Sequence, residues 1–330
     1  MLHKVATALY TMVVLGLVLL LIAFYVQAWL LEIIISQAPL LTVAAAVALV
    51  GLLILRIRLP QAKPSVWLFN PDTVWPWLLA VALLATNTLH IYTVFSPSQT
   101  VAQGNSNTLH YATYNKLYTN NDLDSAGAVF AQQGVDIISM QEVVAADIEY
   151  YQQILGFDYS AISTSGHSAF GSEVGIVSKY PLLSAETVSL GGGMGVLRSV
   201  VDLPGTDVVI YTAHILPPIT PQVNAQSQQA LDTLASVIVK EELPVLVGGD
   251  FNSTVFSPKL RSFIQQINPR TSLAALNNSP VCSWHGAVAG WPLCMRIDHV
   301  FYDEGIDLLG VRVSGDVGSD HRIVTATLAF

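Results

Sequence analysis

The chain has 330 residues, of which 52% are hydrophobic and only 11% are charged, and its formal net charge is −9. A soluble domain carries about 25% charged residues, so this is not the composition of a protein that is soluble throughout. From residue 100 onward the chain has 10 Lys and Arg against 21 Asp and Glu. This acidic balance argues against a protein that binds duplex DNA through clustered basic side chains. It leaves open a small or lipidic phosphate substrate that is held through a metal ion.

Three apolar runs are predicted to cross a membrane, at about residues 5–31, 38–56 and 74–95. A helix needs about 20 apolar residues to cross the hydrocarbon layer of a bilayer. Aromatic residues near the ends of the third run, such as Trp77 and Tyr92, are typical of the membrane interface. We disfavour a cleaved signal peptide for the first run, because the run is long and two more follow it.

The positions of Lys and Arg predict the orientation of these spans. Lys4 precedes the first run, and Arg56, Arg58 and Lys63 follow the second, whereas the connection between the first two runs contains only Glu32. Because basic residues are retained on the cytoplasmic side, we expect the amino terminus inside and the distal part outside. We therefore predict a multi-pass protein of the cytoplasmic (inner) membrane, with the lipid bilayer as an expected partner.

After a polar linker at 96–107, residues 108–330 are predicted to form one α/β domain, in which short apolar strands alternate with amphipathic segments. Polar side chains stand at the ends of these strands, where α/β folds concentrate ligand-binding and catalytic groups. They are Asn115, Glu142, His214, Asp250, Asn252, Asp298, Asp320 and His321. Any one of them has an ordinary interpretation as a turn or cap residue, but six such strand ends in succession indicate a site.

The two cysteines, Cys282 and Cys294, allow two interpretations. They are either two unrelated small apolar residues or a disulfide that closes a loop, which requires an oxidising compartment. The predicted outward orientation of the domain slightly favours the disulfide.

Four segments, "MQEV", "GGDFNST", "RIDHVFY" and "GSDHRIV", follow one another in the distal domain. In their order and spacing, residues 108–330 resemble the endonuclease/exonuclease/phosphatase family of metal-dependent phosphoesterases, which includes pancreatic-type deoxyribonucleases and neutral sphingomyelinases. The resemblance implies an α/β four-layer sandwich of two packed mixed β-sheets flanked by helices, here preceded by three transmembrane helices. The anchored arrangement is similar to a bacterial branch with three spans before an outward-facing catalytic domain.

The resemblance also implies a metal site and a catalytic histidine. Mg²⁺ (or Mn²⁺) would be bound by Glu142, Asn115 and Asp320, which offer the oxygen ligands that Mg²⁺ prefers. His321 would act as the general base or orient the attacking water, and Asp298 would accept a hydrogen bond from its imidazole.

Further roles follow from the same resemblance. Asp250 and Asn252 would position the nucleophile and a phosphoryl oxygen, and His214 would stabilise the phosphate or the leaving group. Arg198 is a candidate contact of the substrate phosphate, with an ordinary surface arginine of a strand as the equal alternative. His299 follows Asp298 directly, so strand alternation points it the other way and we expect it to be structural. Trp284 and His285, in "CSWHG", stand where many relatives have a Thr-Trp-Pro-like turn, from which this sequence departs at Ser283 and His285.

The leading hypothesis is a membrane-anchored, divalent-metal-dependent phosphoesterase that acts outside the cytoplasmic membrane. A phosphorylated and lipid-linked substrate is favoured over nucleic acid by the acidic balance and the adjacent bilayer. The alternatives are an extracytoplasmic nuclease and a non-catalytic anchored binding module. Because every expected catalytic position is filled, we favour an enzyme.

Overall fold

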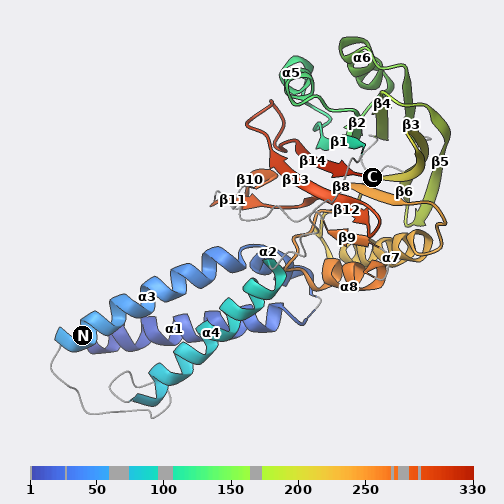
Figure 1. The fold of residues 1–330 in the computed structure, drawn as a ribbon. Coiled ribbons are helices and arrows are strands. Elements are labelled where there is room, and N and C mark those ends of the chain that lie inside the picture. The colour runs from blue at the N-terminus through green and yellow to red at the C-terminus, as the bar shows by residue number, and fades with distance from the viewer. Residues whose placement is uncertain are drawn as a thin grey trace. The chain divides into compact units, whose positions relative to one another are not determined.

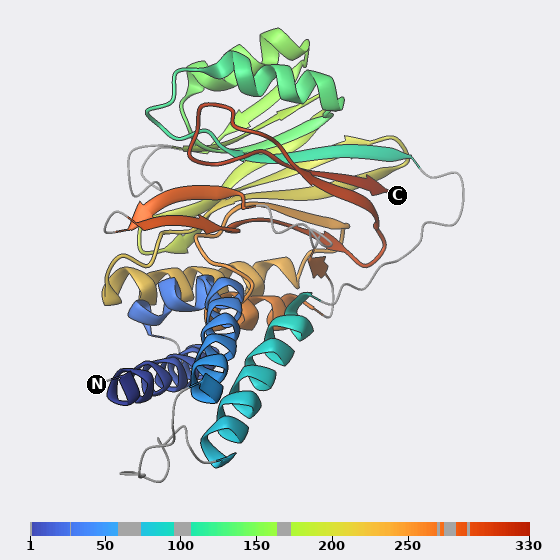
Figure 2. The ribbon, with the colours of Figure 1, turned by 90° about the vertical axis from the view of Figure 1, so that its left-hand side faces the viewer.

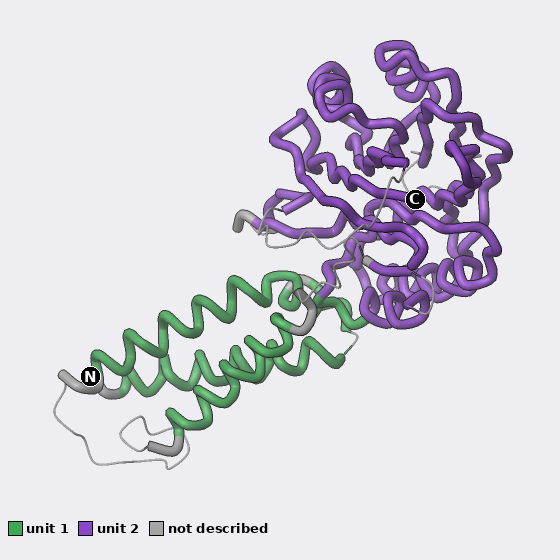
Figure 3. The backbone as a smooth tube through the Cα atoms, in the orientation of Figure 1, with its two compact units in different colours: residues 1–96, 256–258 green, residues 97–255, 259–330 purple. Residues whose placement is uncertain are grey.

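The computed structural model describes residues 2–26, 28–58, 74–95, 107–163, 173–268, 271–273, 282–288 and 291–330. They belong to two compact units, one made of residues 1–96 with 256–258 and the other of the remaining chain (Figure 3). The predicted linker at 96–107 lies outside the described residues, except for Asn107.

The first unit is helical. Its helices are α1 (Leu2–Ala23), α2 (Trp29–Ser36), α3 (Ala38–Arg58) and α4 (Val74–Phe95). Tyr10, Val14 and Leu17 of α1 pack with Leu52 of α3 and Ala80 of α4.

Many large apolar side chains of these helices face outward. Met12 and Val47, for example, are 67% and 68% exposed. An exterior of this kind is what helices in contact with lipid present.

Two of the described helices are long and apolar enough to cross a membrane, at Lys4–Ala23 and Ala38–Leu55. The apolar part of α4, Pro76–Tyr92, is shorter, so three spans are not clearly established. The predicted run at 5–31 is also not one helix, since α1 ends at Ala23 and α2 begins at Trp29. Aromatic and β-branched residues such as those at 24–26 have low helix propensity, which favours a break there.

The second unit contains two six-stranded sheets. The first sheet has the order β13-β14-β1-β2-β4-β3, and the second has the order β5-β6-β7-β8-β12-β9. The strands of the first sheet are β1 (Thr108–Asn115), β2 (Ile137–Val143), β3 (Tyr159–Ile162), β4 (Glu173–Ser178), β13 (Asp307–Val313) and β14 (Val324–Ala329). The strands of the second sheet are β5 (Leu182–Gly191), β6 (Met194–Leu203), β7 (Thr206–His214), β8 (Val245–Asp250), β9 (Thr271–Leu273) and β12 (Asp298–Asp303). Both sheets are mixed, because β1–β2 and β7–β8 are parallel pairs among antiparallel ones.

The two sheets pack face to face, with helices on their outer faces (Figures 1 and 2). On the first sheet lie α5 (Leu123–Gln133) and α6 (Ala145–Leu155), and on the second lie α7 (Pro221–Ile238) and α8 (Pro258–Ile267). This four-layer arrangement confirms the predicted fold of two packed mixed sheets flanked by helices. A separate two-stranded sheet is formed by β10 (Trp284–Val288) and β11 (Trp291–Met295).

Gly248 lets the two sheets approach closely beneath the end of β8. A Cβ atom at this position would lie 1.9 Å from the hydroxyl oxygen of Tyr111 on β1. Tyr111 in turn donates a hydrogen bond to Ser139 (2.6 Å), whose hydroxyl is 2.7 Å from that of Thr212. This buried polar chain links β1, β2 and β7 just below the strand ends that carry the predicted site.

Candidate active site

Three of the predicted residues form one row across the second sheet. His214 at the end of β7 is in register with Asp250 at the end of β8, and Asp250 is in register with Asp298 at the start of β12. Asp298 comes first in its strand because β12 runs antiparallel to β8. Strand pairing thus brings together residues that lie up to 84 positions apart in the sequence.

The first sheet contributes Asn115 and Glu142 from the ends of two parallel strands, β1 and β2. The pairing of β2 with β4 shifts between Gln141 and Val143, and Glu142 has a φ of 56°. A positive φ is unusual for a non-glycine residue, and bulges of this kind redirect side chains at functional sites. Because of this bulge, the direction of the Glu142 side chain does not follow the regular alternation of side chains along β2.

Hydrogen bonds join the two sheets at this point. The Nδ2 of Asn115 donates to Glu142 Oε1 (3.0 Å) and to Asp250 Oδ2 (3.1 Å). Its Oδ1 accepts from the backbone N–H of Leu117 (3.0 Å). In this structure Asn115 therefore holds two carboxylates in place, and its own oxygen is engaged with the backbone.

Asn252 fixes Asp250 from the other side. Its backbone N–H donates to Asp250 Oδ1 (2.8 Å), and its Nδ2 donates to Asp250 Oδ2 (3.2 Å) and to the carbonyl of Ile215 (2.8 Å). The φ of Asn252 is 46°, a left-handed conformation that asparagine tolerates better than most residues. Asn252 thus positions Asp250 and ties the end of β8 to the chain after β7.

His321 is paired with Asp298. Its Nδ1 donates to the Asp298 carboxylate, at 2.9 Å from Oδ2 and 3.1 Å from Oδ1, and its Nε2 lies 3.6 Å from Asp250 Oδ2. The bond to Asp298 fixes the ring orientation and places the proton on Nδ1, so that Nε2 can exchange a proton with a reacting group.

Asp320 and His214 complete the group on its more open sides. Asp320 Oδ1 lies 4.0 Å from His321 Nε2, and His214 Nε2 lies 3.8 Å from both Glu142 Oε1 and Asp250 Oδ2. Asn115, Asp250, Asp298 and His321 are buried, whereas Glu142, His214 and Asp320 are half-buried. The site therefore has a buried floor with accessible carboxylate and imidazole groups around it.

Burial and neighbouring charges both shift the pKa values of the ionisable groups in the site. Burial raises the pKa of Asp250 to about 7, against the opposing charge of His321. Burial lowers the pKa of His321, but the charges of Asp298 and Asp250 outweigh it and raise the pKa to about 10. Burial also lowers the pKa of His214, with His321 adding to the effect and Glu142 opposing it.

The donor set of this site fits a divalent cation. Asp250, Asp298 and His321 have ligand atoms that all lie within 4.8 Å of one another, and Glu142 and Asp320 border them. Asp320 Oδ1 is buried and has no hydrogen-bond partner among the residues that the structure describes. Carboxylate oxygens at such density are the chemistry that Mg²⁺ or Mn²⁺ binds.

Arg198 is bonded to glutamates and to none of the predicted site residues, which favours its interpretation as an ordinary surface arginine of a strand. Its guanidinium is bonded to Glu241 twice, at 2.6 Å from Nε and 2.8 Å from Nη2, and lies 3.5 Å from Glu186. Neighbouring Leu197 belongs to the core between the sheets, so strand alternation turns Arg198 to the outer face.

His299 is also outside the site, as predicted from alternation. It is buried, its Nε2 donates to the carbonyl of Ser253 (2.8 Å), and burial lowers its pKa to about 4. A neutral, fully packed imidazole of this kind is a core residue.

Two serines support the site and were not predicted. Ser319 Oγ donates to the carbonyl of Asn115 (2.8 Å) and accepts from the backbone N–H of His321 (3.0 Å). Ser283 Oγ accepts from the backbone N–H groups of Ile297 (3.1 Å) and Asp298 (3.0 Å). The role of neither serine could be predicted from the sequence, because both act through hydrogen bonds to distant parts of the chain.

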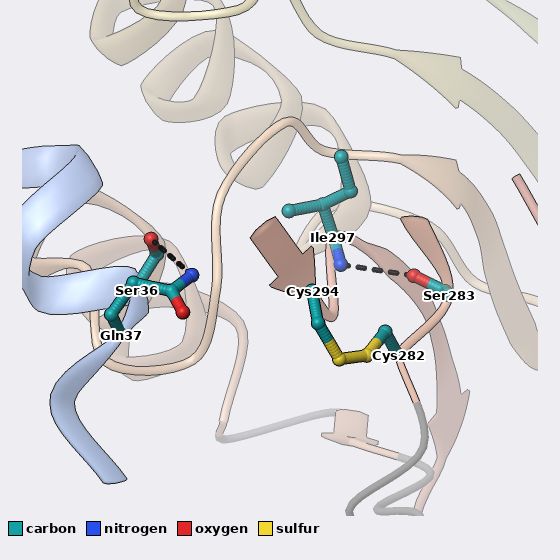
Figure 4. Close-up of a disulfide and its surroundings, with 6 residues drawn as sticks. All are labelled: Ser36, Gln37, Cys282, Ser283, Cys294 and Ile297. Carbon is teal, nitrogen blue, oxygen red and sulfur yellow. Dashed lines mark hydrogen bonds between the residues drawn. A yellow bond between two sulfur atoms is a disulfide. The ribbon is translucent and has the colours of Figure 1, made fainter. Parts of the chain in front are cut away.

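The cysteines form a disulfide in the structure, with the two Cα atoms of Cys282 and Cys294 5.3 Å apart (Figure 4). This favours the second of the two interpretations of the sequence. The disulfide precedes Ser283 directly, so it lies next to residues that contact the site.

Comparison with known proteins agrees with this geometry. A model of the Endonuclease/Exonuclease/phosphatase family matches residues 103–321. No curated protein matches the chain.

Solved structures show the same fold. D. rerio TDP2, in complex with a single strand DNA product, is 17% identical with a TM-score of 0.56, and the match covers 67% of this chain and 98% of that one. TDP2 from Caenorhabditis elegans is 15% identical with a TM-score of 0.55, covering 83% and 97% of the two chains. An endonuclease/exonuclease/phosphatase from Bacteroides vulgatus is 17% identical with a TM-score of 0.54, covering 67% and 98%.

Proposed function

Since the chain belongs to the endonuclease/exonuclease/phosphatase family and is a hydrolase of phosphoester bonds, we propose that it is a membrane-anchored, divalent-metal-dependent enzyme for a lipid-linked phosphoester. The observation that carries the substrate class is a set of exposed apolar side chains that follow the strand ends of the site in the sequence. The apolar helices of the first unit support the anchor.

These apolar side chains follow the same strand ends that carry the site. Tyr118 comes three residues after Asn115, Val144 two residues after Glu142, and Ile219 five residues after His214. They are 62%, 52% and 59% exposed, respectively. The backbone N–H of Tyr118 also donates to Glu142 Oε2 (3.0 Å), which places this residue directly at the site. Tyr118, Val144 and Ile219, here called the apolar rim, would contact the lipid part of a substrate whose phosphate lies on the carboxylates and histidines.

The proposed chemistry is hydrolysis by water at the phosphorus atom. When bound, a divalent cation would polarise the phosphoryl group, and Glu142, Asp320 and Asn115 are the residues that would hold it. Asn115 would do so through Oδ1, which also accepts from the backbone N–H of Leu117. His321 would orient the attacking water, or take up its proton at Nε2 once a bound cation offsets the carboxylate charges that raise the pKa of this ring. Asp298 would stabilise the imidazolium through Nδ1. Asn115 and Asn252 hold Asp250 beside His321, and His214 on the other side of Asp250 would stabilise charge on the phosphate or the leaving oxygen.

A substrate panel with a rim variant tests the substrate class. We expect the detergent-solubilised full-length chain with Mg²⁺ to hydrolyse a phospholipid or polyprenyl phosphate in mixed micelles in preference to single-stranded DNA. Burying an Ile side chain is worth about 1.5–3 kcal/mol, so I219S should raise KM for the lipid-linked substrate about tenfold or more. The effect on a soluble phosphodiester should be much smaller.

The control for this experiment is L183S, which removes an exposed apolar residue from β5, away from the rim. It should leave both substrates unaffected. Preference for DNA with no effect of I219S would replace the lipid proposal with an extracytoplasmic nuclease. D. rerio TDP2, which has the same fold, was solved with a single strand DNA product.

We also propose that the catalytic unit lies outside the cytoplasmic membrane, on the strength of the basic residues at 4, 56, 58 and 63. A reporter fused after Phe330 that is active only outside this membrane should then give a signal, and one that is active only in the cytoplasm should not. The reverse pattern would overturn the orientation.

A further inference from the structure

The β10–β11 hairpin belongs to neither of the two large sheets. An isolated two-stranded hairpin is marginally stable in water, so other contacts must hold it. The Cys282–Cys294 disulfide links the chain before β10 to β11, and Figure 4 shows it beside Ser283. Further hydrogen bonds join the hairpin to the two chain segments that carry Asp298 and His321.

On one side the hairpin holds the start of β12. Ser283 is fully buried, and its Oγ accepts from the N–H groups of Ile297 and Asp298 at 3.1 and 3.0 Å. The first of these bonds is drawn in Figure 4. Asp298 is the partner of His321, so Ser283 fixes the backbone of that pair.

On the other side the hairpin holds residues 320–322. The carbonyl of Ser283 accepts from the N–H of Arg322 (2.7 Å), and the N–H of His285 donates to the carbonyl of Asp320 (3.0 Å). Between them, Trp284 pairs with His321 in an isolated bridge, and its indole Nε1 donates to Asp320 Oδ2 (2.9 Å). The hairpin therefore contacts both chain segments that carry His321 and its partners.

The indole bond also selects which oxygen of Asp320 is available. Trp284 occupies Oδ2, while Oδ1 has no hydrogen-bond partner among the described residues and lies 4.0 Å from His321 Nε2. A carboxylate held by one oxygen presents the other in a fixed direction, and such outer partners orient metal ligands.

We propose that Trp284 is a positioning residue that aims Asp320 Oδ1 at the cation, and that the Cys282–Cys294 disulfide keeps Trp284 in place. This rests on the proposed function, in which Asp320 holds the cation.

The first test is W284F, which keeps an aromatic ring and removes the N–H. Loss of a residue that hydrogen-bonds to a metal ligand typically lowers metal affinity or activity about 10- to 100-fold. We therefore expect Mn²⁺ to bind at least about tenfold more weakly to metal-free W284F, measured by electron paramagnetic resonance without substrate. The kcat should fall, and KM should change less than twofold. The matched control W29F makes the same change in α2 and should bind Mn²⁺ as the wild type does.

The second test opens the disulfide. A dithiol reductant would convert Cys282 and Cys294 to two thiols, with two electrons and two protons transferred and the dithiol oxidised to its own disulfide. We expect reduction to weaken Mn²⁺ binding about tenfold, as in W284F. The C282S/C294S variant should show the same weak binding with and without reductant, which separates the effect of this disulfide from other effects of the reagent.

The outcomes separate this proposal from the proposed function. Wild-type Mn²⁺ affinity in both W284F and C282S/C294S would overturn the positioning role, whether or not the chain hydrolyses phosphoesters. Weak Mn²⁺ binding in both variants, with unchanged circular dichroism, would support it even if the substrate panel fails. If W284F does not fold, the comparison of reduced and oxidised wild type decides.

Discussion

H321A is expected to lower kcat/KM for phosphoester hydrolysis about a hundred- to ten-thousand-fold, which is the usual contribution of a general acid–base residue. The imidazole is held by Asp298 through Nδ1 and faces Asp250 with Nε2, so alanine removes the group that exchanges the proton of water. The measurement is steady-state kinetics on the purified full-length chain with saturating Mg²⁺.

H110A is the matched control for that variant. His110 lies on β1, where its Nδ1 is 3.3 Å from the hydroxyl of Thr327 on β14, and it makes none of the contacts that define the site. It should keep wild-type activity. A loss in H110A as large as in H321A would point to general disruption of the fold and remove the support for His321.

E142Q is expected to lower kcat/KM about a hundred- to a thousand-fold and to raise the Mg²⁺ concentration needed for half-maximal rate. Gln preserves the shape of Glu142 and an acceptor for the N–H of Tyr118, but it removes the negative charge. The polarisation supplied by a bound metal is worth several kcal/mol, which corresponds to this change in rate.

The measurement for E142Q is a Mg²⁺ titration of the rate, with Mn²⁺ binding by calorimetry in parallel. Glu149 is exposed on α6, a few residues further along the chain, and E149Q is the control for loss of one negative charge nearby. Unchanged Mg²⁺ dependence in E142Q would remove Glu142 from the metal site.

Much of the candidate site could be predicted from the sequence, because the predicted side chains stand at or within a few residues of the end of an apolar strand. "GGDFN" shows this, since two glycines permit close packing of β8 and the acidic residue follows at once. The row of His214, Asp250 and Asp298 then follows from strand pairing, which brings the ends of β7 and β8 to the start of β12.

Other features depend on information that local patterns do not contain. Arg198 lies in a strand with apolar residues on both faces, so alternation gave no indication of the side to which it points. The direction of the Asn115 amide is set by the backbone N–H of Leu117. The bond between Trp284 and Asp320 joins residues 36 positions apart, and only the folded chain brings them together.

The helical unit shows that hydropathy does not predict where each helix ends. The uninterrupted apolar run at 5–31 predicted one long span, yet the structure ends α1 at Ala23. Hydropathy reports whether residues tolerate lipid, whereas the end of a helix depends on backbone conformation and local propensity. The sequence therefore predicted the bounds of α3 and α4 closely, at 38–56 and 74–95, but not the break between α1 and α2.

The most direct test of the central claim is the rate of hydrolysis of a lipid-linked phosphoester by the purified full-length chain with Mg²⁺, with EDTA, and with Mg²⁺ restored. We expect turnover with Mg²⁺, its loss in EDTA, its recovery on restoring Mg²⁺, and near-background rates for H321A and E142Q throughout. Equal turnover by the wild type and both variants, or turnover that persists in EDTA, would contradict it.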